Sequence, residues 1–184
     1  MFWAIGISFL GVLFFNRESI VETVEEKMDS WTQYDDLYKR YGTRWGVDWT
    51  WLKAIALNES RNGQEKSVLR GIENPKDIQN SKSSDGKSWG IMQVTLTTAR
   101  DMDLTATEEK LNNVEYSINL GARYVSKLKD YFSEADPRHI EWVIKSYNQG
   151  PGNTSKEKSG KIAKGYADEY WVRWQSNLKR VRGV

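Results

Sequence analysis

Apolar side chains recur every three or four residues along most of the chain after residue 30, which is the period of an amphipathic α-helix. This pattern is sustained at about 31–41, 48–60, 114–132, 137–147 and 163–180, and a shorter helix is expected near 97–102. The strict apolar–polar alternation that is typical of strands is nearly absent. The sequence therefore predicts a mainly α fold for residues 29–184.

Capping residues predict where several of these helices begin. Asp48 can accept N–H bonds from a first helical turn, and Asp136 followed by Pro137 gives an N-cap and a proline at the first helical position. Thr105–Glu108 has the form of a capping box. The core face of the helix after Pro137 is expected to hold Ile140, Val143, Ile144 and Tyr147.

Glycine, proline and polar runs predict the helix ends and the loops. Gly42 and the run Gly150–Gly152 are expected to stop helices. Two stretches rich in Lys, Ser, Asn and Gly, 61–87 and 153–161, are expected to be loops. A loop as long as 61–87 inside a compact domain is typically functional or mobile.

The first 15 residues form an apolar run without a charge. As a helix this run covers about 22 Å, short of a hydrocarbon core of ~30 Å unless the helix continues through Ile20. It lacks the basic start and the small-residue cleavage site of a signal peptide. The pattern favours a membrane anchor at 1–16, followed by an acidic stalk at 17–28, over a cleaved signal peptide or a buried or partner-binding helix.

One polar residue interrupts the apolar face of the helix that Asp48 would cap. Leu52, Ile55, Ala56 and Glu59 share that face. Burial raises the pKa of a carboxyl, and a glutamic acid in such a place can act as a general acid. The alternative is that Glu59 tilts to solvent or pairs with a neighbouring cation, so the helix by itself does not decide its role.

Composition excludes several kinds of chemistry. The formal net charge of +2 and the lack of a basic stripe argue against nucleic acid as a partner. With no cysteine and one histidine, His139, the chain has neither a thiolate nucleophile nor a multi-histidine metal site. Nine tryptophans and nine tyrosines supply aromatic faces for a core or for stacking on sugars.

Three short motifs follow one another in a familiar order: Glu59-Ser60, Gly90-Ile91-Met92-Gln93 and Ser146-Tyr147-Asn148-Gln149-Gly150. Together they resemble the soluble lytic transglycosylase domain, a lysozyme-like family that cuts bacterial peptidoglycan. The similarity covers about residues 31–180. It implies a lysozyme-like α-helical domain with a glycan-binding groove and with Glu59 as the catalytic acid.

The resemblance also implies roles for the residues around Glu59. Ser60 would orient the acid or contact substrate, Met92 and Gln93 would line the groove, Tyr147 would hydrogen-bond the Glu59 carboxyl, and Asn148 would contact the glycan. A tyrosine of the last helix lines such sites as well, and Tyr170 fits this position better than Tyr166.

A single carboxylate suits the reaction of this family. Glu59 would protonate the bond between N-acetylmuramic acid and N-acetylglucosamine and then take the proton of the muramic C6 hydroxyl, which closes a 1,6-anhydro ring. No metal or organic cofactor is needed. The rivals are a muramidase, which needs a second carboxylate such as Glu65, Glu73 or Asp85, and a wall-docking module without activity.

The expected partners are peptidoglycan strands and, through the N-terminal helix, a membrane, with the catalytic domain facing the cell wall or periplasm or carried in a virion membrane. A wall-remodelling bacterium, a secretion or conjugation machine and a phage all use such domains. Assembly partners in an envelope or a virion are therefore compatible with the sequence, which does not decide among these owners.

Overall fold

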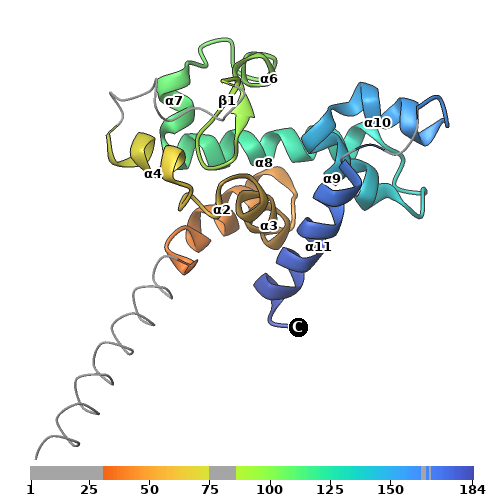
Figure 1. The fold of residues 1–184 in the computed structure, drawn as a ribbon, viewed down its shortest axis with the longest axis horizontal. Coiled ribbons are helices and arrows are strands. Elements are labelled where there is room, and N and C mark those ends of the chain that lie inside the picture. Colours follow the sequence, from red (N-terminus) through yellow and green to blue (C-terminus); the bar gives the residue numbers. More distant parts are fainter. Residues whose placement is uncertain (1–30, 75–85, 163–164, 166) are drawn as a thin grey trace, which may run out of the picture. The chain divides into compact units, whose positions relative to one another are not determined.

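The computed structural model describes residues 31–74, 86–162, 165 and 167–184 (Figure 1). The chain divides into two compact units, Met1–Tyr34 and Asp35–Val184, and all elements named below belong to the second unit. The predicted anchor at 1–16 and stalk at 17–28 lie outside the described residues. Within the described part of the chain, no helix is both long enough and apolar enough to cross a membrane.

The second unit is mainly helical, as the sequence predicts. Its helices are α2 (Asp35–Trp45), α3 (Trp49–Ser60), α4 (Lys66–Glu73), α6 (Leu96–Arg100), α7 (Glu108–Asn112), α8 (Val114–Tyr131), α9 (His139–Gln149), α10 (Pro151–Lys158) and α11 (Ala167–Arg182). Two short strands, β1 (Ser88–Trp89) and β2 (Val94–Thr95), pair in antiparallel fashion with Trp89 opposite Val94. The helices carry the core, and the strands form a small hairpin at its side (Figure 1).

Helix α3 lies at the centre of the packing. It contacts α2, α8 and α11, and α9 contacts both α8 and α11. Leu52, Ala54, Ile55 and Ala56 of α3 are fully buried, so this helix is apolar around most of its circumference, as expected of a helix enclosed by others. The enclosure fixes the direction in which its last turn, with Glu59, emerges.

The predicted cap of α3 is confirmed. The Asp48 carboxylate accepts the backbone N–H of Thr50 at 2.9 Å. Two other predicted starts are wrong. Thr107, rather than Thr105, caps α7 through the N–H of Lys110, and α9 begins at His139 because the Asp136 carboxylate accepts the N–H of Arg138 in a preceding turn. In each case a side chain close to the expected cap binds the backbone two or three residues further on.

Of the two predicted helix stops, Gly42 differs from the structure and Gly150 is confirmed. Helix α2 continues through Gly42 and ends before Gly46, which has a φ of +63°. Gly42 is instead needed for close packing, since a Cβ there would lie 2.7 Å from the Val47 carbonyl oxygen. Gly150 does end α9, but a new helix, α10, starts directly at Pro151 because a proline is tolerated in the first turn.

The two predicted loops are partly helical. Helix α10 occupies most of the stretch 153–161, and α4 occupies part of 61–87, with Val68 buried. Residues 75–85 lie outside the described residues. The polar composition of both stretches is compatible with short helices whose other faces meet solvent.

Candidate active site

Glu59, in the last turn of α3, lines a pocket of about 480 Å³. The pocket is lined by residues of α3, the hairpin, α6, α8 and α9, namely Glu59, Ser88, Gln93, Val94, Thr95, Thr98, Tyr124, Tyr147, Asn148, Gln149 and Gly150. All three sequence motifs therefore meet at this pocket. Among the described residues that line it, Glu59 is the only carboxylate.

Burial and two neighbours set the proton affinity of Glu59. Burial raises the pKa of this carboxyl to about 7, while a hydrogen bond from Tyr170 and the positive charge of Arg173 act in the opposite direction. The Tyr170 hydroxyl donates to Glu59 Oε1 at 2.7 Å. A group with a pKa near 7 can both give and accept a proton at neutral pH, which is what general acid–base catalysis requires.

The position of Tyr170 is fixed by a residue that the sequence did not single out. Asn58, next to Glu59 on α3, donates through Nδ2 to the Tyr170 carbonyl oxygen at 3.0 Å and accepts from Asn177 Nδ2 at 2.7 Å. These bonds tie α11 to α3 one residue away from the acid. Asn58 is polar and adjacent to a motif, but nothing in its spacing indicated a partner more than a hundred residues away.

Tyr147 lines the pocket, but its predicted hydrogen bond to Glu59 is wrong. Its hydroxyl donates to the Met92 carbonyl oxygen at 2.7 Å, and its ring packs against Tyr124 with centroids 5.4 Å apart. Burial, together with the nearby Glu59 charge, raises the pKa of Tyr147 well above its usual range. Tyr147 therefore joins α9 to the hairpin turn, and Tyr170 takes the contact with the acid.

Ser60 is buried and makes only internal bonds among the described residues. Its hydroxyl donates to the Ile91 carbonyl oxygen at 2.7 Å and accepts the N–H of Gly63 at 2.9 Å. Of the two roles the resemblance implied, this geometry fits orientation of the acid rather than contact with substrate. The bond holds the end of α3 against the hairpin turn.

Met92 does not line the pocket, so its predicted place in the groove is wrong. The side chain is fully buried and packs on Gly121 of α8, where an added Cβ would lie 2.7 Å from Met92 Cε. The neighbouring Gln93 does line the pocket, with a φ of +46° and its Nε2 donating to the Gly90 carbonyl oxygen at 2.8 Å. The turn thus sends one side chain into the core and the next to the pocket.

Gly90 makes this turn possible. Its φ is +74°, and a Cβ at this position would lie 1.9 Å from the Leu111 carbonyl oxygen. Only glycine combines that backbone conformation with so close an approach.

Asn148 lines the pocket and has an unused acceptor. Its Oδ1 is buried and has no hydrogen-bond partner among the described residues. Buried polar atoms are nearly always paired in folded proteins. A ligand group that donates a hydrogen bond, such as an amide or a hydroxyl, would satisfy this acceptor.

Tyr124, Thr95 and Thr98 line the pocket without having been predicted. Tyr124 lies beside the apolar stripe of α8, so its pattern indicated core packing rather than a pocket. No group of three or more His, Cys, Asp or Glu side chains suitable for a metal ion occurs in the part of the chain that the structure describes.

The fold and the convergence of the three motifs on one acid define a class of protein. The family model of the transglycosylase SLT domain matches residues 36–169. The chain belongs to the transglycosylase SLT domain family, as the motif resemblance indicated.

Individual relatives are more distant. The chain is 25% identical to membrane-bound lytic murein transglycosylase F of Hahella chejuensis over 146 aligned residues. The aligned stretch makes up 78% of this chain and 25% of that protein. The proteins of the same name from Stutzerimonas stutzeri and Pseudomonas fluorescens are 24% and 23% identical over 151 residues, 81% of this chain and 27% of theirs. The chain thus spans about a quarter of the length of these relatives.

Proposed function

We propose that this protein is a peptidoglycan lytic transglycosylase that cleaves the β-1,4 bond between N-acetylmuramic acid and N-acetylglucosamine and leaves a 1,6-anhydro-muramic end. The observation that carries the proposal is Glu59, a single carboxyl that lines a polar pocket and whose pKa is raised to about 7. Membership of the SLT domain family and the names of the relatives support the same activity.

In this mechanism Glu59 acts twice. Protonated Glu59 donates its proton to the glycosidic oxygen as the bond from C1 to that oxygen breaks. The carboxylate then accepts the proton of the muramic C6 hydroxyl while that oxygen bonds to C1 and closes the anhydro ring, so Glu59 ends protonated again. Tyr170, which donates to Glu59 Oε1 at 2.7 Å, stabilises the carboxylate between the two steps.

The remaining side chains of the pocket suit a sugar chain. Gln93 and Asn148 present amide groups, and the open Oδ1 of Asn148 would accept a bond from an N-acetyl N–H or a hydroxyl. Tyr124 and Tyr147 supply aromatic surface on the same wall. We therefore assign substrate contact to Gln93, Asn148, Tyr124 and Tyr147, and positioning of the acid to Ser60 and Tyr170.

A hydrolytic muramidase would place a second carboxylate roughly 5–9.5 Å from the acid. The described lining residues of the pocket contain no such group, and the earlier candidate Asp85 lies outside the described residues. A transglycosylase avoids this need because the C6 hydroxyl of its substrate replaces water.

The test is the product of one digest. Purified peptidoglycan incubated with the protein should release fragments ending in 1,6-anhydro-muramic acid, which mass spectrometry separates from the reducing ends left by hydrolysis. Glu59→Gln keeps the size of the side chain but cannot transfer a proton, so it should fold and release almost nothing. Reducing ends would replace the proposal with a muramidase, and an active Glu59→Gln protein would remove Glu59 from the mechanism.

We also propose that residues 1–16 anchor the protein in a membrane, with the catalytic domain facing the cell wall or periplasm or carried in a virion membrane. The apolar, uncharged run at the start of the sequence supports this arrangement. The words "membrane-bound" in the names of the relatives agree with it.

A further inference from the structure

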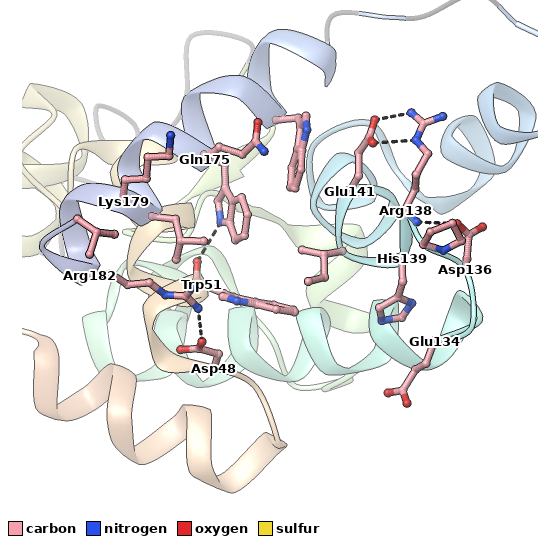
Figure 2. A pocket seen from close by; sticks show the side chains of 16 residues that line it. Asp48, Trp51, Glu134, Asp136, Arg138, His139, Glu141, Gln175, Lys179 and Arg182 are labelled. Atoms are coloured by element: carbon pink, nitrogen blue, oxygen red, sulfur yellow. Dashed lines mark hydrogen bonds and ion pairs between the residues drawn. The ribbon is translucent and has the colours of Figure 1, made fainter.

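A second cavity, of about 820 Å³ (Figure 2), is lined at the start of α3, whereas Glu59 lies in the last turn of that helix. Asp48 and Trp51 at the start of α3, α11 from Trp171 onward, and the first turn of α9 with the segment that leads into it form its walls. Along α11 the lining runs from Trp171, the residue after Tyr170, to Arg182, so the cavity extends roughly 17 Å along the helix away from the level of the acid. We refer to this cavity as the tryptophan cleft.

Three indole rings form a fixed aromatic corner in the tryptophan cleft. Trp171 and Trp174 are stacked with centroids 5.2 Å apart and planes 16° apart, and Trp51 stands at 81° to Trp174 at 6.0 Å. Trp174 is buried and donates through Nε1 to the Trp51 carbonyl oxygen at 3.3 Å. Trp51 and Trp171 are only partly buried, so two aromatic surfaces at a large angle to each other remain open to a ligand.

Charged groups line the same cleft, and several of them are already paired. Arg182 binds Asp48 at 2.6 Å, and Arg138 binds Glu141 at 2.5 Å (Figure 2). Asp136 is paired with Lys158. Because these pairs cancel one another, the lining presents hydrogen-bonding groups with little net charge, which suits an uncharged polar ligand better than an ion.

One buried polar atom of the cleft has no hydrogen-bond partner in the described part of the chain. His139 lines it (Figure 2), and its Nε2 is buried without a hydrogen bond among the described residues, while Nδ1 contacts the Ser133 carbonyl oxygen at 3.2 Å. A ligand hydroxyl can either donate to or accept from an imidazole nitrogen. Gln175 and Lys179, both exposed on α11, add further hydrogen-bonding groups to the opposite wall.

We propose that the tryptophan cleft is a second saccharide-binding site, which holds an uncharged stretch of amino-sugar glycan away from the bond that is cut. The apolar C–H faces of pyranose rings stack on indoles. The hydroxyl and acetamido groups of the sugar can form hydrogen bonds with the paired charged side chains and with His139. A concave cavity of this volume is typical of sites for small molecules and short chains, whereas protein interfaces are broad surfaces. The identity of the glycan as peptidoglycan rests on the proposed function.

The first test measures binding without cleavage. The full chain with Glu59→Gln is sedimented with purified peptidoglycan sacculi, with and without Trp171→Ala. Loss of one stacking surface should raise the apparent Kd about fivefold or more. Val172→Ala is the matched control, because Val172 is the next residue on α11, is 62% exposed and lies outside the cleft lining. Equal binding of the Trp171 and Val172 variants would overturn the proposal.

The second test separates this site from the catalytic pocket. With Glu59 intact, Trp171→Ala should raise KM on sacculi while leaving kcat and KM on a short soluble glycan fragment unchanged. If the protein cleaves sacculi and Trp171→Ala binds them as tightly as the unchanged protein does, the proposed function stands and the proposal of a second site is refuted. Conversely, weaker sacculus binding by Trp171→Ala in a protein that cleaves nothing would support the second site and remove the proposed function.

A third measurement identifies the occupant directly. Tri-N-acetylchitotriose, a neutral saccharide, is titrated into the Glu59→Gln chain labelled with ¹⁵N-tryptophan, and the Trp171 indole signal is assigned through Trp171→Phe. We expect this signal to shift with saccharide concentration. A signal that stays in place, or that shifts only with protein concentration as two copies associate, would overturn the assignment.

Should Trp171→Ala unfold, the double variant Gln175→Ala with Lys179→Ala replaces it in the binding assay. Unchanged binding by that double variant also overturns the proposal.

Discussion

A single carboxylic acid, Glu59, accounts for most of the chemistry that the catalytic pocket can perform. Its burial beside a helix core disfavours the charged form, and Tyr170 and Arg173 restore part of its acidity, so that its pKa is about 7. The competing influences come from two helices, α3 and α11. Changes to single side chains should therefore alter stability and activity in ways that depend on pH.

The raised pKa of Glu59 predicts a loss of stability as pH rises. The folded state holds the proton more tightly than the unfolded chain, whose glutamate titrates near 4.5, so stability present below pH 4.5 is lost as pH rises to about 7. The loss amounts to about 3 kcal/mol at most. Urea unfolding at pH 4.5 and pH 8 should show Glu59→Gln gaining stability over the unchanged protein with rising pH. A constant difference would mean that Glu59 titrates normally.

Tyr170 is predicted to set the alkaline limit of activity. Its hydrogen bond to Glu59 lowers the pKa of the acid. Tyr170→Phe removes that bond, so the acid should stay protonated to a higher pH, while turnover falls because the carboxylate loses a bond typically worth ~1–3 kcal/mol.

The pH–rate profile of peptidoglycan cleavage checks this. Tyr147→Phe is the matched control, since the Tyr147 hydroxyl binds the Met92 carbonyl oxygen and not Glu59. The alkaline limb of the pH–rate profile should lie at the same pH in Tyr147→Phe as in the unchanged protein. If both tyrosine variants shift the limb equally, the Tyr170 bond is not what tunes the acid.

Among the helices, α9, α10 and α11 are joined by a buried lysine. Lys145 of α9 is fully buried and binds Glu157 of α10 at 2.6 Å, Asp168 of α11, and Glu141 of its own helix at 3.1 Å. Burial works to lower the pKa of Lys145, but the hydrogen bonds that Lys145 donates to Asp168, Glu157 and Glu141 outweigh it and raise the pKa. Asp168 lies two residues before Tyr170, so this cluster fixes the turn of α11 that reaches the acid.

Removing this cation should be severe. Lys145→Met leaves three carboxylates without their shared cation, which typically costs about 3–5 kcal/mol when the pair is buried. Chemical denaturation at pH 7 measures the loss. Lys158→Met, which breaks the more exposed pair with Asp136, should change the free energy of unfolding very little. Equal effects of the two substitutions would show that Lys145 contributes no more than a surface pair.

For the molecule as a whole, the proposed anchor and the two proposed glycan sites suggest cutting close to a membrane. The described domain carries the catalytic pocket at one end of α3 and the tryptophan cleft at the other. A protein held at a membrane and bound to glycan at a second site would cut strands within a short reach. This arrangement depends on the N-terminal residues acting as an anchor.

The anchor makes a simple prediction. The full chain expressed in bacteria should partition with membranes and need detergent for extraction, whereas a chain starting at Met28 should be recovered in buffer and keep its activity on sacculi. Fractionation followed by an activity assay checks both statements. Recovery of the full chain in buffer, or a mature protein that starts beyond Phe15, would contradict the anchor.

Local features of the sequence determined the helical fold, the Asp48 cap, the long helix at 114–131 and the three motifs around Glu59, because each depends on periodicity or on residues close in the chain. The tertiary structure alone decided which tyrosine meets the acid. Tyr147 comes from α9, which packs on α8 and α11, whereas the packing of α11 against α3 brings Tyr170 within bonding distance of Glu59.

The difference between local sequence and tertiary packing also explains why the positions of Met92 and Ile140 were predicted wrongly. Met92 and Gln93 are neighbours in a turn, and the positive φ of Gln93 and the close approach at Gly90 determine which one faces the core. Ile140 was expected in the core but is 41% exposed and lines the tryptophan cleft. Sequence thus determined which residues could take part, and contacts between distant helices decided where each side chain points, because those contacts depend on packing that no local pattern records.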